Sequence, residues 1–138
     1  AFAWGMVELC YETCLTQIEK QRQKGLSIDK EQGLMSNLYQ IYMNLRNIEN
    51  IVFQSAWMQK KGVRDPAFIN ATKAFCSEAC VAAVNHTMEI VGEGCAQIDG
   101  TVGKLFRDAK LLEIGAGTTA INIFSAMRME IDRSVQAS

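Results

Sequence analysis

The sequence predicts an all-α protein, an antiparallel up-and-down bundle of four main helices plus one short helix. Three observations lead to this prediction. Apolar residues recur at three- and four-residue steps through most of the chain, strand-like alternation is nearly absent, and Pro66 is the only proline. Most glycines stand between the periodic stretches, so the connections are short and successive helices are expected to pack as antiparallel neighbours.

The first predicted helix covers about residues 2–24. Its apolar stripe consists of Val7, Cys10, Cys14 and Ile18. Basic residues in the last turns suit the helix dipole, and Gly25 offers a stop. Because the chain opens at Ala1, inside an apolar stretch and without a methionine, we expect it to be a piece of a longer polypeptide.

The second predicted helix covers about residues 29–61. Its apolar seam steps alternately by four and three residues and consists of Leu34, Leu38, Ile41, Leu45, Ile48 and Val52. Asp65 is predicted to cap a third helix that has Pro66 as its first residue. Gly92 and Gly94 are expected to end that third helix.

A short fourth helix is predicted at about residues 102–112, followed by a flexible link at residues 114–117. Thr118 or Thr119 is expected to cap the last helix. The apolar residues of that helix repeat with the heptad spacing that bundle helices use, and they are Ala120, Phe124, Met127 and Ile131.

The composition is that of one globular domain, and we treat residues 1–138 as a single helical bundle. Its net charge of -1, with basic and acidic residues interspersed, predicts no nucleic-acid partner. No apolar run reaches membrane-spanning length and no signal peptide is visible, so we expect no membrane insertion. Five cysteines without a small-domain framework favour the cytoplasm or another reducing intracellular compartment.

Two cysteine pairs, Cys10/Cys14 and Cys76/Cys80, stand four residues apart on predicted helices. Four thiolates from two helices could hold zinc or an iron–sulfur cluster. Zinc sites use tighter loops with shorter spacing, however, and free cysteine is a common core residue. We therefore expect no metal. His86, the only histidine, is expected in the bundle interior or at its rim.

The most specific stretch of the sequence is residues 107–118, RDAKLLEIGAGT. It resembles the signature near the end of acyl-CoA dehydrogenases, and its last six residues look most like the isovaleryl-CoA dehydrogenase branch. Gly25, Gln32 and Gly92 match further family positions in the expected order. The resemblance covers essentially the whole chain and is closest to the carboxy-terminal helical domain of that family.

This resemblance implies a flavin enzyme that holds FAD between this bundle and a β domain. In the family reaction a proton leaves Cα of an acyl-CoA while hydride leaves Cβ for flavin N5. A short or branched acyl-CoA would be the substrate and an electron-transferring flavoprotein-type protein the electron acceptor. The bundle would also form the core of a homodimer or homotetramer, with a neighbouring bundle contacting the FAD. The isolated chain is not expected to turn over substrate.

The resemblance leaves this chain without a catalytic base. Many relatives carry a glutamate directly before the Gly-Thr pair, and Ala116 stands there instead. Either the base lies a few residues upstream of Ala1, as in the isovaleryl branch, or it has been lost. Gly115, Ala116 and Gly117 are the candidate substrate-binding residues, since small residues would widen an acyl pocket for a branched chain. They could equally serve only the turn.

The candidate cofactor-binding residues implied by the resemblance are Gln21, Lys24, Gln32, Glu89, Gly92 and Thr118. The hydroxyl of Thr118 could bind flavin, cap a helix, or do both. Other positions depart from the family. Gln21 replaces the arginine that holds the FAD diphosphate, and Glu89 replaces a glutamine. Lys24, Glu93 and Ala120 stand where the family has a phenylalanine, a glycine and a glutamate. Lys24 could supply the missing positive charge. These departures support an alternative, a degenerate non-catalytic subunit or oligomerisation module with weak or no FAD binding.

Overall fold

The computed structural model describes residues 1–26, 31–96 and 100–137, and it contains helices and no strand in these ranges. The elements are α1 (Phe2–Gln23), α2 (Gln32–Lys60), α3 (Pro66–Val91), the 3-10 helix η2 (Gly92–Ala96), α4 (Thr101–Ile114) and α5 (Thr119–Gln136). The all-α prediction is confirmed. The predicted start of the second helix at Asp29 lies outside the described residues.

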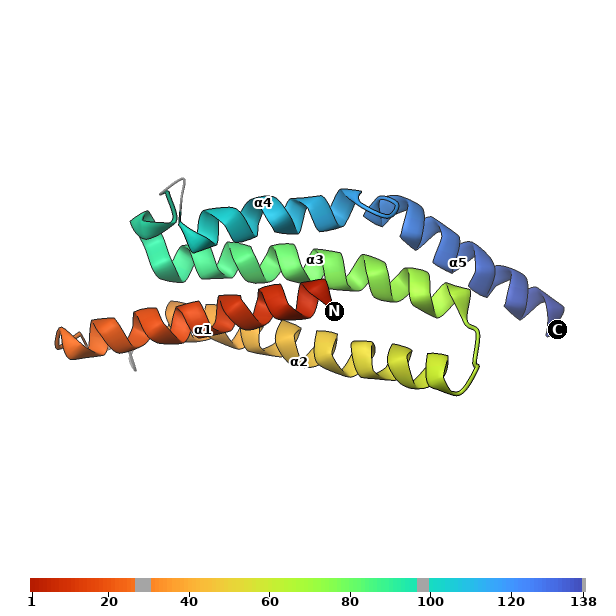
Figure 1. Cartoon of the computed structure of the whole chain (residues 1–138), viewed down its shortest axis with the longest axis horizontal. Coiled ribbons are helices and arrows are strands. Elements are labelled where there is room, and N and C mark those ends of the chain that lie inside the picture. The colour runs from red at the N-terminus through yellow and green to blue at the C-terminus, as the bar shows by residue number, and fades with distance from the viewer. Residues whose placement is uncertain (27–30, 97–99, 138) are drawn as a thin grey trace.

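Helix α3 is the centre of the bundle and packs against every other α-helix. α1 and α2 lie on one side of it, and α4 and α5 lie on the other (Figure 1). α4 follows the carboxy-terminal half of α3, and α5 continues in the same general direction past the amino-terminal half (Figure 1). The short helix and the last helix therefore share one position of the bundle, one after the other.

Two helix starts follow from single side chains, as predicted. Asp65 accepts a hydrogen bond from the backbone N–H of Phe68 at 3.0 Å, and Pro66 is the first residue of α3. Between the two threonines offered by the sequence, Thr118 is the cap of α5, because its Oγ1 accepts from the backbone N–H of Ile121 at 3.3 Å. At the other end of α3, Gly92 has φ 68°, a left-handed conformation that favours glycine.

The predicted stripes of the first two helices form the core. Val7, Cys10 and Cys14 of α1 are fully buried, as are Ile41 and Ile48 of α2. The remaining seam residues of α2 are either buried or packed at the edge of this core. The expectation that no apolar run reaches membrane-spanning length does not hold for α3, which is long and apolar enough to cross a bilayer by length and composition alone. Its central place in the bundle accounts for its apolar character, since it must present apolar side chains to helices on several sides.

The heptad stripe of α5 does not face the bundle. Phe124 is 66% exposed and Ile131 is 62% exposed. The buried residues of α5 are instead Asn122 and Ala126. α5 therefore packs along α3 through small and polar side chains. The heptad spacing correctly indicated an apolar stripe, but it carried no information about which side of the helix would meet α3.

Candidate functional site

The turn between α4 and α5 is exposed and has an unusual backbone. Ala116 has φ 55° and Gly117 has φ 90°, so two successive residues adopt left-handed conformations. A non-glycine residue such as Ala116 rarely adopts this conformation unless its surroundings impose it. Gly115, Ala116, Gly117 and Thr118 are all exposed. The three candidate substrate-binding residues are therefore at the surface, next to the candidate flavin contact.

Two side chains hold the turn by its carbonyl groups. Lys73 of α3 donates from Nζ to the carbonyl oxygen of Gly117 at 2.6 Å. Asn122 of α5 donates from Nδ2 to the carbonyl oxygens of Gly117 and Thr118, each at 2.9 Å. A Cβ added at Gly117 would lie 3.1 Å from Asn122 Nδ2, which is closer than most real contacts. Position 117 therefore favours glycine for two reasons, because its φ is positive and because a Cβ would crowd Asn122.

A second set of contacts joins the same turn to α3. The hydroxyls of Ser77 and Thr119 lie 3.1 Å apart, and Thr119 Oγ1 also donates to the carbonyl oxygen of Glu113 at 3.4 Å. Sequence analysis did not single out Lys73, Ser77 or Asn122. The sequence signal for Asn122 was an amide side chain between two isoleucines, since a polar residue in an apolar run needs a hydrogen-bond partner when it is buried.

A mostly apolar cavity of about 350 Å³ lies beside Lys73 and Ser77. It is lined by the start of α1, the carboxy-terminal third of α2, the amino-terminal half of α3 and Leu112 of α4. Its polar groups include Ser55, Cys76 and Thr72, whose buried Oγ1 has no hydrogen-bond partner within the described structure. A concave apolar site with a few polar groups is the usual form of a small-molecule site.

The other five candidate cofactor residues lie at one end of the bundle, away from the α4–α5 turn. Gln21 and Lys24 are at the end of α1, Gln32 begins α2, and Glu89 and Gly92 are at the end of α3 (Figure 1). All are exposed except Gln21, which is half-buried.

The carboxylate of Glu89 is engaged within the protein. Asn37 Nδ2 donates to Glu89 Oε2 at 2.7 Å, and Asn37 Oδ1 lies 3.0 Å from His86 Nδ1. His86 therefore belongs to a polar network between α2 and α3 at the rim.

One chain presents two separate groups of candidate cofactor residues. Lys73, which touches the turn, and Glu89 are sixteen residues apart on α3, or ~24 Å along the helix at about 1.5 Å per residue. Thr118 and the five residues at the other end of the bundle therefore lie too far apart to hold one end of the same ligand. A long ligand, or two copies of it, is needed to contact both groups.

The cysteines lie in an apolar environment. Burial raises the pKa of Cys10 to about 11 and that of Cys80 to about 12. The Cys80 thiol points to the sulfur of Met6 at 4.0 Å. Within the described residues no group of three or more potential ligands comes together for a metal. Because metals bind the thiolate, the raised pKa values favour a packing role for these neutral thiols.

Comparison with known proteins decides the family. Residues 1–130 match the family model described as the acyl-CoA dehydrogenase C-terminal domain. The chain belongs to the acyl-CoA dehydrogenase family. The resemblance carried by residues 107–118 is thus confirmed.

Relatives are identical to this chain at about a quarter of the aligned positions. A probable acyl-CoA dehydrogenase of Bacillus subtilis is 27% identical over 124 residues, covering 88% of this chain and 32% of its own length. A mitochondrial isovaleryl-CoA dehydrogenase of Oryza sativa subsp. japonica is 26% identical over 117 residues, covering 85% of this chain and 29% of its own length. The chain therefore spans about a third of the length of these relatives.

A solved structure shares the fold. The crystal structure of an acyl-CoA dehydrogenase from Slackia heliotrinireducens superposes with a TM-score of 0.88 at 18% sequence identity. The match covers 99% of this chain and 36% of the solved chain. The arrangement of all five α-helices is thus that of a known acyl-CoA dehydrogenase chain.

Proposed function

We propose that this chain acts as the carboxy-terminal domain of a flavin-dependent dehydrogenase for a short or branched acyl-CoA. The observation that carries the proposal is the exposed turn of Gly115, Ala116 and Gly117, which Lys73 and Asn122 hold rigidly beside Thr118. A wall made of small residues leaves room for a branched acyl chain. The side of a substrate pocket that faces the reacting group must also keep a fixed backbone conformation.

The proton acceptor in this proposal comes from the polypeptide before Ala1. Ala116 has no titratable group, so the turn itself cannot remove a proton from the substrate. The start of α1 and Leu112, three residues before Gly115, line the same cavity. A carboxylate on a preceding turn of α1 would therefore come close to the small-residue turn, within the reach that general-base catalysis requires.

FAD would supply the hydride acceptor in the complete protein. The chain's own contributions would be the Thr118 hydroxyl at one FAD and the group at the other end of the bundle at the FAD of a neighbouring copy. The distance between the two groups supports this division. Lys24 is exposed and positively charged, as a contact to the diphosphate requires.

The electron acceptor, the oligomeric state and the cellular compartment are proposed from the same family membership. A protein of the electron-transferring flavoprotein type would reoxidise the flavin, and a homodimer or homotetramer would provide the neighbouring copy. The exposed apolar stripe of α5 supports such association, because large apolar patches on a soluble surface mark contact sites. The cytoplasm or another reducing intracellular compartment would suit the free cysteines.

A second candidate function is a non-catalytic subunit or oligomerisation module. It is favoured by the residues that depart from the flavin-binding pattern, which are Gln21, Lys24, Glu89, Glu93 and Ala120. In this case the same bundle would associate with an active partner while binding FAD weakly or not at all.

Flavin spectroscopy on the polypeptide that contains this domain separates the two candidates. We expect stoichiometric FAD absorbance that bleaches when a short branched acyl-CoA is added without oxygen. Replacing Gly115→Tyr should lower kcat/KM for a branched acyl-CoA by about 10-fold or more relative to a straight one, the scale on which a pocket discriminates small groups. Protein purified without flavin, and unable to take up added FAD, would support the non-catalytic subunit instead.

A further inference from the structure

Lys73 places a positive charge directly behind the exposed α4–α5 turn. Its Nζ donates to the carbonyl oxygen of Gly117 at 2.6 Å, and Thr118 is the next residue along the chain. The lysine is half-buried and lines the mostly apolar cavity of about 350 Å³. Apolar surroundings screen a charge less than open water does, so the field of Lys73 is felt at the turn more strongly than that of a lysine on an open surface.

This charge has no carboxylate partner in the part of the chain that the structure describes. The group that Lys73 binds is a neutral carbonyl, and the ion pairs among the described residues do not include Lys73. The carboxylate of Glu113, beside the same turn, is paired with Lys110 at 2.9 Å. Glu78 stands five residues after Lys73 on α3 and so lies on another side of the helix. The turn therefore carries an excess positive charge that comes from Lys73.

Thr118, next to this charge, has a hydroxyl hydrogen to offer to a ligand. Its Oγ1 accepts from the backbone N–H of Ile121 at 3.3 Å, and the residue is exposed. In this contact the oxygen uses one lone pair, and the hydroxyl hydrogen can still be donated. The carbonyl oxygens and unprotonated ring nitrogens of a flavin accept such hydrogen bonds. The donor at Thr118 therefore fits the FAD of the proposed function.

The uncompensated charge and the hydroxyl donor together indicate a task for Lys73. A flavin ring that accepts a hydride becomes an anion, because two electrons arrive with only one proton. A fixed positive charge near the place where negative charge develops stabilises the charged form. We propose that Lys73 shifts bound FAD towards its reduced, negatively charged form, and that it acts through its charge and not through its hydrogen bond to the turn. This inference rests on the proposed function, since it requires FAD beside Thr118.

Changing the charge and the hydrogen bond separately tests the proposal. The experiment uses the FAD-loaded polypeptide that contains this domain, and it measures the midpoint potential of the flavin in equilibrium with a reference dye. Lys73→Gln removes the charge but keeps an N–H donor, whereas Lys73→Arg keeps the charge. We expect Lys73→Gln to shift the equilibrium about tenfold towards oxidised flavin, which lowers the potential of a two-electron couple by ~30 mV. Lys73→Arg should keep the original potential.

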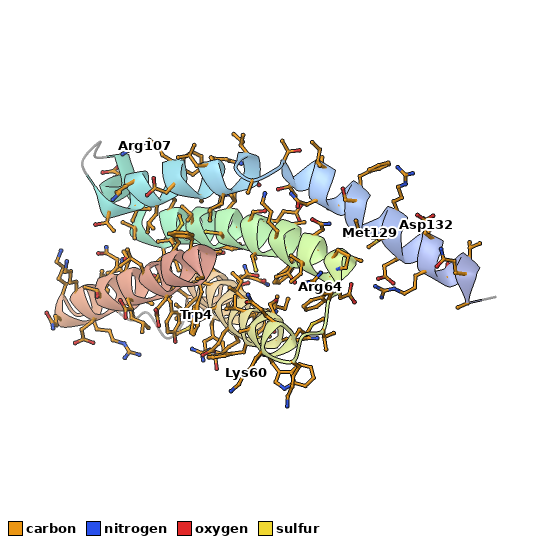
Figure 2. The ribbon with its side chains drawn as sticks, turned by 45° about the vertical axis from the view of Figure 1, so that its right-hand side comes forward. Trp4, Lys60, Arg64, Arg107, Met129 and Asp132 are labelled. Carbon is orange, nitrogen blue, oxygen red and sulfur yellow. The ribbon has the colours of Figure 1, made fainter. Side chains whose placement is uncertain are left out.

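Two control variants separate the charge at the turn from other effects. Asn122→Ala removes a hydrogen bond to the same carbonyl of Gly117 without changing any charge. Lys60→Gln removes an exposed charge near the end of α2, on the side of α3 away from α5 (Figure 2). Both controls should keep the original potential.

The possible outcomes distinguish this inference from the proposed function. Lys73→Met is a second neutral variant, which replaces Lys73→Gln where the glutamine variant does not fold. If FAD is bound and the neutral variants keep the original potential, the inference is wrong and the proposed function stands. The inference is also wrong if Asn122→Ala lowers the potential as much as they do, because the geometry of the turn would then be the cause. A polypeptide that takes up no FAD would overturn both.

Discussion

The two halves of α3 are packed in different ways. Its carboxy-terminal half is surrounded by α1, α2 and α4, and Cys80, Val84 and Thr87 there are fully buried or nearly so. Its amino-terminal half carries α5 on one side and lines two open cavities together with α2 on the other. In that half the contacts to α5 and its turn include hydrogen bonds from Lys73 and Ser77.

The two halves therefore contribute differently, one mainly to the stability of the fold and the other mainly to the orientation of α5 and its turn. Apolar burial around the carboxy-terminal half is non-directional and supplies most of the folding free energy. The hydrogen bonds at the amino-terminal half contribute less but fix the turn of Gly115–Gly117 and the direction of α5. Arg133 adds to this near the end of α5, with Nη2 3.0 Å from Oδ1 of Asp65. The half with the exposed apolar surfaces is also the half that carries the candidate acyl-pocket wall.

The largest effect is expected from comparing equal truncations in the buried core and on the exposed stripe of α5. Ile48→Ala removes a fully buried side chain from the core and should lower the free energy of unfolding by about 2–5 kcal/mol. Ile131→Ala, at a position 62% exposed on α5, should change it by no more than about 0.5 kcal/mol. Urea unfolding followed by circular dichroism measures both. A similar loss in the two variants would mean that the stripe of α5 is covered in solution.

A smaller effect is expected from removing the hydrogen bonds of Asn122 and Lys73 to the α4–α5 turn. Asn122→Ala removes two hydrogen bonds to the carbonyls of Gly117 and Thr118 and should cost about 1–3 kcal/mol. Amide hydrogen exchange should accelerate in the turn and in α5, and stay unchanged around Val84 in the core. Lys73→Met should produce the same pattern more weakly. If hydrogen exchange accelerated evenly over the whole protein, these hydrogen bonds would instead stabilise the entire fold.

The smallest effect is expected from pH. The pKa of Cys80 is about 12 in the folded chain, above the ordinary value of 9.0, so folding favours the neutral thiol. The resulting stability is complete below pH 9 and is lost as pH rises from 9 towards 12. One pH unit above the pKa of the unfolded-state thiol, the free energy of unfolding should have fallen by about 1 kcal/mol because of this thiol. Urea unfolding at pH 8 and 10 should show a smaller difference for Cys80→Ala than for the original chain. An equal difference would exclude a contribution from Cys80.

Much of the fold is encoded locally and was predictable from the sequence. The stripe of α1, the seam of α2 and the Asp65–Pro66 start of α3 each depend on residues a few positions apart. The same holds for the family, because the motif of residues 107–118 is one continuous stretch. Spacing within a helix determines which residues share a face, since the helix geometry fixes the rotation per residue.

Only the tertiary structure decided which partner each face meets. The stripe of Phe124 and Ile131 was visible in the sequence, but its exposure depends on the path of α5 along α3. The hydrogen bond from Lys73 to Gly117 joins residues 44 positions apart, and no local spacing specifies such a contact. The separation of Thr118 from Glu89 likewise depends on the register between helices. That register results from packing among whole helices, which no local segment encodes by itself.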